Sequence, residues 1–168
     1  MAVALCYVQC SIGASSIDDE QFAILVGALL GEVGELILQA ARHNTSVACV
    51  AVAPARDGEE RGVDGLDGLR GVARLLEASG RRSDAIGRIG PAEFAVVAAG
   101  VNRAGARQLA NRLRDSVGAE LRAGYDAVGS RRGGGGGGGL EARSLVARAA
   151  RALEMAKLEG KWIKEARE

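Results

Sequence analysis

The chain has 168 residues, of which 48% are apolar and 26% charged, a composition that suits one soluble globular domain with its own core. Its formal net charge of +1 disfavours broad binding to nucleic acids or anionic membranes, and aromatic residues make up only 3%, too few to stack the bases of single strands. Three cysteines, an odd number without metal-site spacing, favour a reducing compartment, so we expect a cytoplasmic protein.

The first long element is a helix, predicted from Ser16 or Asp18 to about Arg42. Acidic residues lie early in this helix and an arginine ends it, as the helix dipole favours. Its apolar stretch has about the length of a membrane span, but Glu32 and Glu35 interrupt it. We therefore expect a helix that is buried against a core, and no membrane insertion.

Strands and helices then alternate along the chain. Their order is strand, helix, two hairpin strands, helix, strand and helix, at 46–53, 66–78, 84–89, 94–99, 104–117, 120–128 and 140–161, and a short apolar run at 2–9 is a further strand candidate. Loops are predicted at 55–65 and at 131–139, which is rich in glycine. This order predicts an α/β fold of the α+β type, a central, mainly antiparallel sheet of about five strands flanked by helices, as in ferredoxin-like and nucleotidyl-cyclase-like folds.

The hairpin carries the most specific motif. Arg81 and Asp84 form an Arg-x-x-Asp pair, and five residues later the chain reads Gly-Pro-Ala-Glu-Phe over 90–94. This stretch resembles the signature of GGDEF domains, the diguanylate cyclases that make cyclic di-GMP, whose pattern is R-x-x-D, five residues, then G-G-(D/E)-E-F. The run 152–161 is similar to the family's closing motif. The resemblance implies an N-terminal extension at 1–17 and a degenerate GGDEF domain at 18–168, with the glycine-rich loop as an internal segment.

The departures from this family pattern imply a lost catalytic site. A cyclase of the family holds two divalent cations with two acidic residues, which supply hard oxygen ligands. The positions of these acids are Ala92 in the signature and Ala53 after the first core strand. Pro91 replaces the second signature glycine and has no amide donor. Because Gly90, Glu93 and Phe94 alone cannot rebuild a two-metal site, we expect no catalytic residues, no diguanylate cyclase activity, no bound metal and no required cofactor.

The same resemblance implies that the family's inhibitory product site is retained. In the family, the Arg and Asp of R-x-x-D bind cyclic di-GMP, and an arginine on the helix after the hairpin completes the site; Arg81, Asp84 and Arg112 occupy these positions. A guanidinium can grip phosphate or the acceptor edge of guanine, and a carboxylate can accept from guanine's N–H groups. The prediction is a receptor with cyclic di-GMP as regulatory ligand, acting on an unidentified protein partner as a homodimer or ligand-bridged dimer.

Two alternatives stay open. Arginine is frequent in this chain, so the three residues could be vestigial in a ligand-free scaffold or dimerisation module. A residual nucleotide-binding enzyme would instead use Glu93 with Lys157 and Lys161, which sit where the family contacts the triphosphate. We favour solvated cations at a helix end for the two lysines, because a lysine near a helix C-terminus suits the dipole.

Overall fold

A computed structural model of the full chain describes residues 19–54, 66–117, 121–129 and 138–166. The predicted N-terminal extension with its candidate strand, the predicted loop at 55–65 and most of the predicted glycine-rich loop lie outside these residues. In chain order the elements are α2 (Asp19–Arg42), β1 (Val47–Pro54), α3 (Leu66–Ser79), β2 (Ala85–Arg88), β3 (Phe94–Ala99), α4 (Arg103–Val117), β4 (Leu121–Val128), α5 (Gly138–Leu158) and β5 (Ile163–Glu165).

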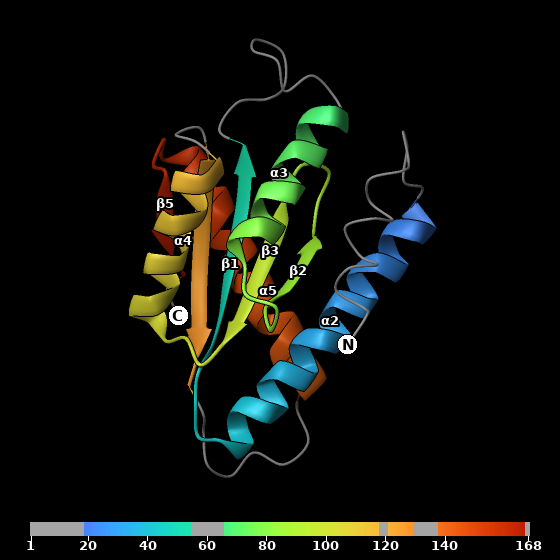
Figure 1. Ribbon diagram of the computed structural model, residues 1–168, viewed down its shortest axis with the longest axis vertical. Helices are drawn as coiled ribbons and strands as arrows, with labels where there is room; N and C mark the ends of the chain where they lie inside the picture. Colours follow the sequence, from blue (N-terminus) through green and yellow to red (C-terminus); the bar gives the residue numbers. More distant parts are fainter. Residues whose placement is uncertain (1–18, 55–65, 118–120, 130–137, 167–168) are drawn as a thin grey trace.

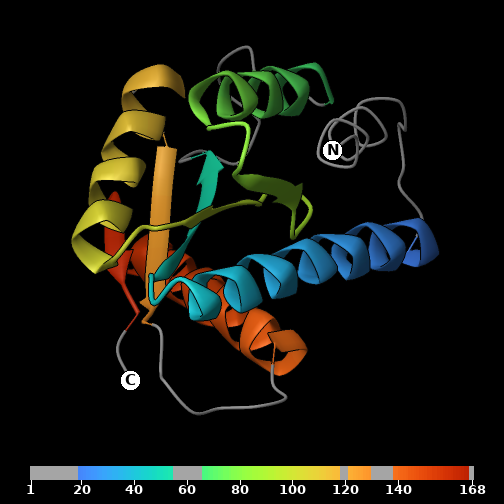
Figure 2. The same cartoon turned by 60° about the horizontal axis from the view of Figure 1, so that its bottom comes forward.

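A five-stranded mixed sheet lies at the centre, with helices on both faces (Figure 1). Its strand order is β2-β3-β1-β4-β5, and each neighbouring pair is antiparallel except β4 and β5, which are parallel. Helices α3 and α4 pack on one face, while α2 and α5 lie side by side on the other (Figure 2). This arrangement confirms the predicted α+β fold with a mainly antiparallel sheet.

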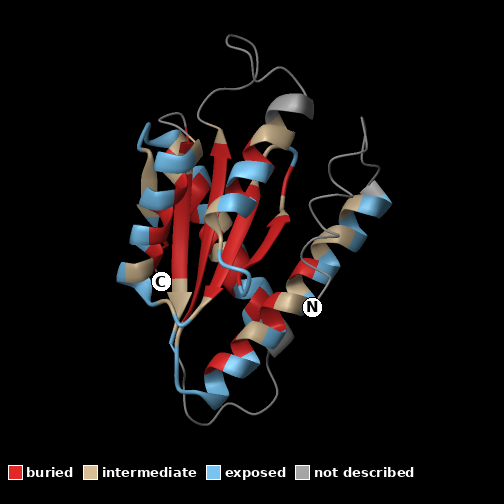
Figure 3. Ribbon diagram, viewed as in Figure 1, coloured by how far each residue is buried: buried red, intermediate tan, exposed pale blue. Residues whose placement is uncertain are grey.

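The central strand β1 is buried from Val47 to Ala53, which explains why its sequence is an uninterrupted apolar run. Its side chains alternate between the two faces of the sheet. Val50 packs in the cluster under α3 and α4, and Cys49 packs in the cluster under α2 and α5. The buried residues are concentrated in the sheet and on the helix faces that cover it (Figure 3). The fold therefore has two apolar layers, one on each side of the sheet.

The last helix packs closely against β4. A Cβ atom at Gly124 would lie 2.0 Å from the backbone nitrogen of Leu153, so this position accepts only glycine unless α5 moves. Ala149 and Ala152 are buried on the facing side of α5. These small residues bring the helix backbone close to the strand and fix the position of the C-terminal end of α5.

The predicted extent of the last helix was wrong at its C-terminal end. Instead of continuing to Lys161, α5 ends at Leu158, and the chain then forms β5 beside β4. Gly160 has a φ of 65°, and the amide of Lys161 donates to the carbonyl of Ala156 at 2.9 Å, the pattern of a Schellman cap. The short strand was missed because three residues carry no periodic signal.

The long first helix is only partly buried. Leu29, Val33 and Ile37 contact the core, whereas Ile24 is 64% exposed and Leu38 is 40% exposed. This helix is long and apolar enough to cross a membrane. The core helix of a soluble protein can have the same length and composition. The expected helix is therefore present, but its outer face carries apolar side chains that no described residue covers.

Candidate functional site

The tip of the β2–β3 hairpin is held by internal contacts. The amides of Ile89 and Gly90 donate to the carbonyl of Glu93 at 2.8 and 3.3 Å. The Arg88 guanidinium donates from Nε to the carbonyl of Gly90 at 3.0 Å and from Nη2 to the carbonyl of Pro91. Sequence reasoning did not single out Arg88, although an arginine two residues before a tight turn is well placed to bind the turn's carbonyls. The segment 90–94 thus forms a tip that is held by backbone hydrogen bonds and by the side chain of Arg88.

The one acid retained in the signature is bound to a lysine of α5. Lys157 Nζ lies 2.6 Å from Glu93 Oε1 and 2.7 Å from Glu154 Oε1. Burial alone would lower the pKa of Lys157, but its hydrogen bonds to Glu154 and Glu93 outweigh burial and raise that pKa. The expectation that Lys157 is a solvated cation was therefore wrong. Lys161 is 65% exposed and pairs with Glu159 at 3.0 Å, so it is closer to the solvated cation that we expected.

The described residues around the tip offer few oxygen ligands for a metal ion. Ala53 is 2% exposed and lies at the end of β1, and neither it nor Ala92 carries an oxygen ligand. Within the described part of the chain, no group of three or more histidine, cysteine, aspartate or glutamate side chains could hold a metal ion. Glu93, the remaining carboxylate, is paired with Lys157. The described donors therefore do not fit the two cations that a cyclase of this type needs.

At the other end of the hairpin, the three predicted product-site residues meet around one cavity. Arg81 and Asp84 come from the turn before β2, and Arg112 comes from α4; all three line a cavity of about 260 Å³. The remaining lining residues come from the end of β3 and the start of α4: Ala98, Gly100, Val101, Asn102, Gly105, Gln108 and Leu109. The structure brings together the residues that the sequence placed in one site.

The Arg-x-x-Asp spacing has a local structural cause. The amide of Asp84 donates to the carbonyl of Arg81 at 2.9 Å, and the amide of Arg81 donates to Asp84 Oδ2 at 2.8 Å, so the four residues close a tight turn. This turn places the guanidinium and the carboxylate on the same cavity. Asp84 therefore has a structural role in addition to any role in binding.

The second carboxylate oxygen of Asp84 is buried without a partner. Asp84 is 5% exposed, and among the described residues nothing donates a hydrogen bond to its Oδ1. Burial raises the pKa of this carboxyl, although the Arg81 amide and the charges of Arg81 and Arg112 oppose the shift. Neither guanidinium has a hydrogen-bond or ion-pair partner in the described part of the chain. A buried acceptor without a donor is costly, so the fold holds the charged form of Asp84 in an unfavourable environment.

Comparisons with known proteins identify the architecture. The structure is similar to the GGDEF domain of YfiN from Pseudomonas aeruginosa, with a TM-score of 0.67 and 19% identity over 83% of this chain and 93% of that one. The chain has the fold of a GGDEF domain. It is also similar to the active GGEEF domain of a diguanylate cyclase from Vibrio cholerae, with a TM-score of 0.66 and 19% identity over 84% and 96% of the two chains.

A third similar structure contains a ligand. The GGDEF domain of DgcB from Caulobacter crescentus, in complex with c-di-GMP, has a TM-score of 0.62 and 18% identity over 81% of this chain and 86% of that one. No protein-family model matches the sequence, and no curated protein matches it. The likeness to GGDEF domains is therefore one of fold, with most side chains different.

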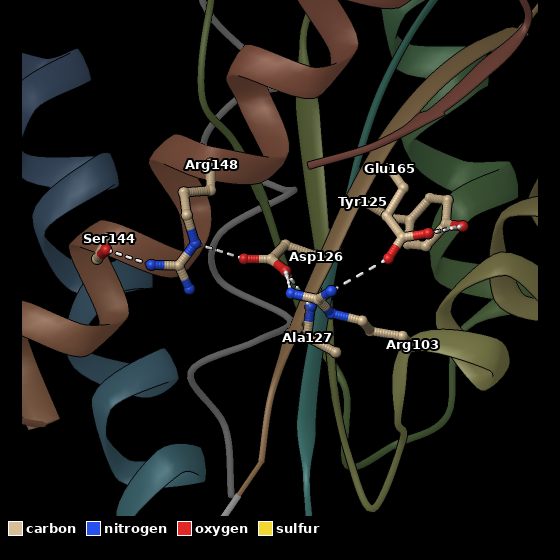
Figure 4. A network of polar contacts seen from close by, with 7 residues as sticks. All are labelled: Arg103, Tyr125, Asp126, Ala127, Ser144, Arg148 and Glu165. Carbon is tan, nitrogen blue, oxygen red and sulfur yellow. Dashed lines mark hydrogen bonds and ion pairs between the residues drawn. The ribbon is translucent and has the colours of Figure 1, made fainter. Parts of the chain in front are cut away.

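An ion network centred on a buried aspartate, which the sequence did not suggest, lies on the same GGDEF fold (Figure 4). Asp126 on β4 is 1% exposed and is bound by Arg148 Nε at 2.5 Å and Arg103 Nη2 at 3.5 Å. Arg103 also pairs with Glu165 at 3.3 Å, and the Tyr125 hydroxyl donates to Glu165 at 3.2 Å. The network joins the start of α4, the middle of α5 and β5 to β4. Its only sequence signal was an acid within a strand whose other charged residue is Arg122.

Proposed function

We propose that this domain is a catalytically inactive, cytoplasmic receptor for cyclic di-GMP, which binds in the cavity of Arg81, Asp84 and Arg112. Occupancy would change the contact of the domain with a partner protein. The observation that carries the proposal is that Arg81, Asp84 and Arg112 line one cavity, while neither guanidinium has a hydrogen-bond or ion-pair partner among the described residues. A ligand with phosphates and N–H groups satisfies both kinds of group at once.

The energies of such contacts are sufficient for a regulatory ligand. A hydrogen bond to a charged group contributes about 1.5–3 kcal/mol, and micromolar affinity requires about 8 kcal/mol. Three charged side chains, together with stacking among the bases of a ligand dimer, reach that range. One guanidinium alone does not, so the proposal depends on Arg81, Asp84 and Arg112 acting on the same molecule.

The proposed inactivity rests on the tip of the hairpin. Ala53 and Ala92 stand where the two metal-binding acids are expected, and Glu93 is neutralised by Lys157. Lys157, which would otherwise contact a triphosphate, is shared between Glu93 and Glu154. These substitutions support binding without turnover, because among the described residues near the tip Glu93 is the remaining carboxylate and it is paired with Lys157.

Titration calorimetry with cyclic di-GMP tests the proposal. We expect binding to the wild-type chain, and a loss of affinity of about 10- to 100-fold in Arg81→Ala and in Arg112→Ala. Arg82→Ala is the matched control, because Arg82 is the exposed neighbour of Arg81 and does not line the cavity. Absence of heat at high micromolar ligand, or an equal loss in the Arg82 variant, would overturn the proposal.

A ligand-free scaffold or dimerisation module is the second candidate function. The observation that favours it is the outer face of α2, where Ile24 and Leu38 are exposed. Such a module predicts a mass in light scattering that rises with protein concentration and does not respond to cyclic di-GMP. A ligand-bridged dimer predicts instead that the mass increases when the ligand is added.

A further inference from the structure

We infer that Gln108 is a specificity-determining residue that contacts the nucleobase of the bound ligand; this inference rests on the function proposed above. Gln108 lies on α4 four residues before Arg112, so both side chains extend from the same side of the helix. Both line the cavity that Arg81 and Asp84 also line. The position of Gln108 is therefore set by the same helix that positions the arginine.

The carboxamide of Gln108 is available for a ligand. Within the described part of the chain it has no hydrogen-bond partner. The other amide of the cavity lining, Asn102, is already used, because its Oδ1 accepts the amide of Gly105 at 2.9 Å and caps the start of α4. Gln108 thus retains both its donor and its acceptor, whereas Asn102 is held in place by its cap.

The neighbours of Gln108 indicate which part of a ligand it contacts. Arg81 and Arg112 supply two positive charges, and a charged donor binds phosphate about twice as strongly as a neutral amide does. A neutral amide beside them therefore adds little at a phosphate. The edge of a nucleobase is neutral and offers donors and acceptors side by side, which a carboxamide matches with its own pair.

The cavity also has a surface suited to the flat face of a base. Ala98, Val101 and Leu109 contribute apolar atoms to the lining, next to the polar groups. Asp84 offers an acceptor from the turn before β2, and Gln108 offers a donor and an acceptor from α4. A base lying between these two elements would contact both, while its phosphate would lie toward the guanidinium groups.

Three cyclic dinucleotides that share one sugar–phosphate ring test this inference. Cyclic di-GMP, cyclic di-IMP and cyclic di-AMP differ only in their bases, and their affinities are measured by calorimetry or, for weak binders, by chemical-shift titration. We expect Gln108→Ala to weaken cyclic di-GMP about 5- to 10-fold and to weaken at least one of the other ligands by a clearly different factor. Equal losses for all three ligands would assign Gln108 to the phosphate or to cavity shape and would overturn the inference, as would no loss.

Asn111→Ala is the matched control for this experiment. Asn111 is an exposed amide on the same helix, it does not line the cavity, and its removal should leave all three affinities unchanged. If the wild-type chain binds cyclic di-GMP and Arg81→Ala weakens it, but Gln108→Ala changes nothing, the inference alone fails. If the wild-type chain binds none of the ligands, the proposed function fails and the role of Gln108 fails with it.

Discussion

The two ends of the β2–β3 hairpin differ in how their charged groups are satisfied. At the tip, Lys157 is paired with Glu93 and Glu154, and Arg88 is bonded to backbone carbonyls. At the opposite end, Arg81 and Arg112 have no partner among the described residues. The charged groups at the tip are satisfied by internal contacts, which stabilise the fold. The cavity end still carries groups that only a ligand or solvent can satisfy.

Among the variants that test this difference between the two ends, we expect the largest change in ligand affinity from Asp84→Asn. The variant keeps an oxygen that can accept the Arg81 amide, but it loses the negative charge at the cavity. Because a hydrogen bond to a charged group is lost, we expect cyclic di-GMP affinity to fall about 10- to 100-fold, measured by calorimetry. The free energy of unfolding should stay within about 1 kcal/mol of wild type, since the turn is retained. Unchanged affinity would contradict a ligand contact at this carboxyl.

The pH dependence of stability tests separately whether the charged carboxyl of Asp84 is unfavourable in the folded state, with Asp84→Asn as the reference. Burial raises the pKa of Asp84 above its ordinary value of 3.8, so the charged carboxyl costs stability in the folded state at neutral pH. As the pH falls through the raised pKa toward 3.8, this cost is relieved in the wild-type chain and not in Asp84→Asn. Thermal unfolding midpoints across this range should therefore shift in favour of wild type on acidification. A shift in favour of the variant would show that the carboxylate is stabilised when charged.

At the tip, Lys157→Met should lower the stability of the fold and leave ligand affinity unchanged, the reverse of what we expect for Asp84→Asn. Removing the ammonium leaves Glu93 and Glu154 without their shared partner, and we expect the free energy of unfolding to fall by about 1 kcal/mol in a denaturant titration. Cyclic di-GMP affinity should not change, because the cavity lies at the other end of the hairpin. Lys161→Met is the control, since that lysine is mostly exposed and its loss should matter less. A loss of affinity in the Lys157 variant would show that contacts at the tip affect ligand binding at the other end of the hairpin.

Much of this contrast was predictable from local sequence, and the rest depends on tertiary contacts. The Arg-x-x-Asp pair is closed by a four-residue turn, so its two side chains share a surface for local reasons. Likewise, the core strand and the amphipathic helices follow from apolar periodicity. The pairing of Lys157 with Glu93 was missed because the two residues are 64 positions apart.

The position of Gln108 on the cavity and the ion network of Asp126 were missed for the same reason. An exposed glutamine on a polar helix has no distinguishing signal until the fold places it beside Arg112 on a cavity. Asp126 is the one acid in β4, and its two arginine partners come from α4 and α5. In contrast, the end of α5 could have been anticipated, because Gly160 is a common helix terminator.

The smallest effect is expected when one acidic residue is introduced at the hairpin tip: cyclase activity should remain absent. Ala92→Asp restores the signature acid, but Ala53 still supplies no second oxygen ligand and Glu93 remains paired with Lys157. Two divalent cations need both acids, so GTP and magnesium should yield no cyclic di-GMP when the products are separated by chromatography. The cavity at the other end should bind ligand as before. Product from this variant would mean that another carboxylate completes the metal site, and Asp57, the nearest acid after β1 and outside the described residues, would be the first to replace.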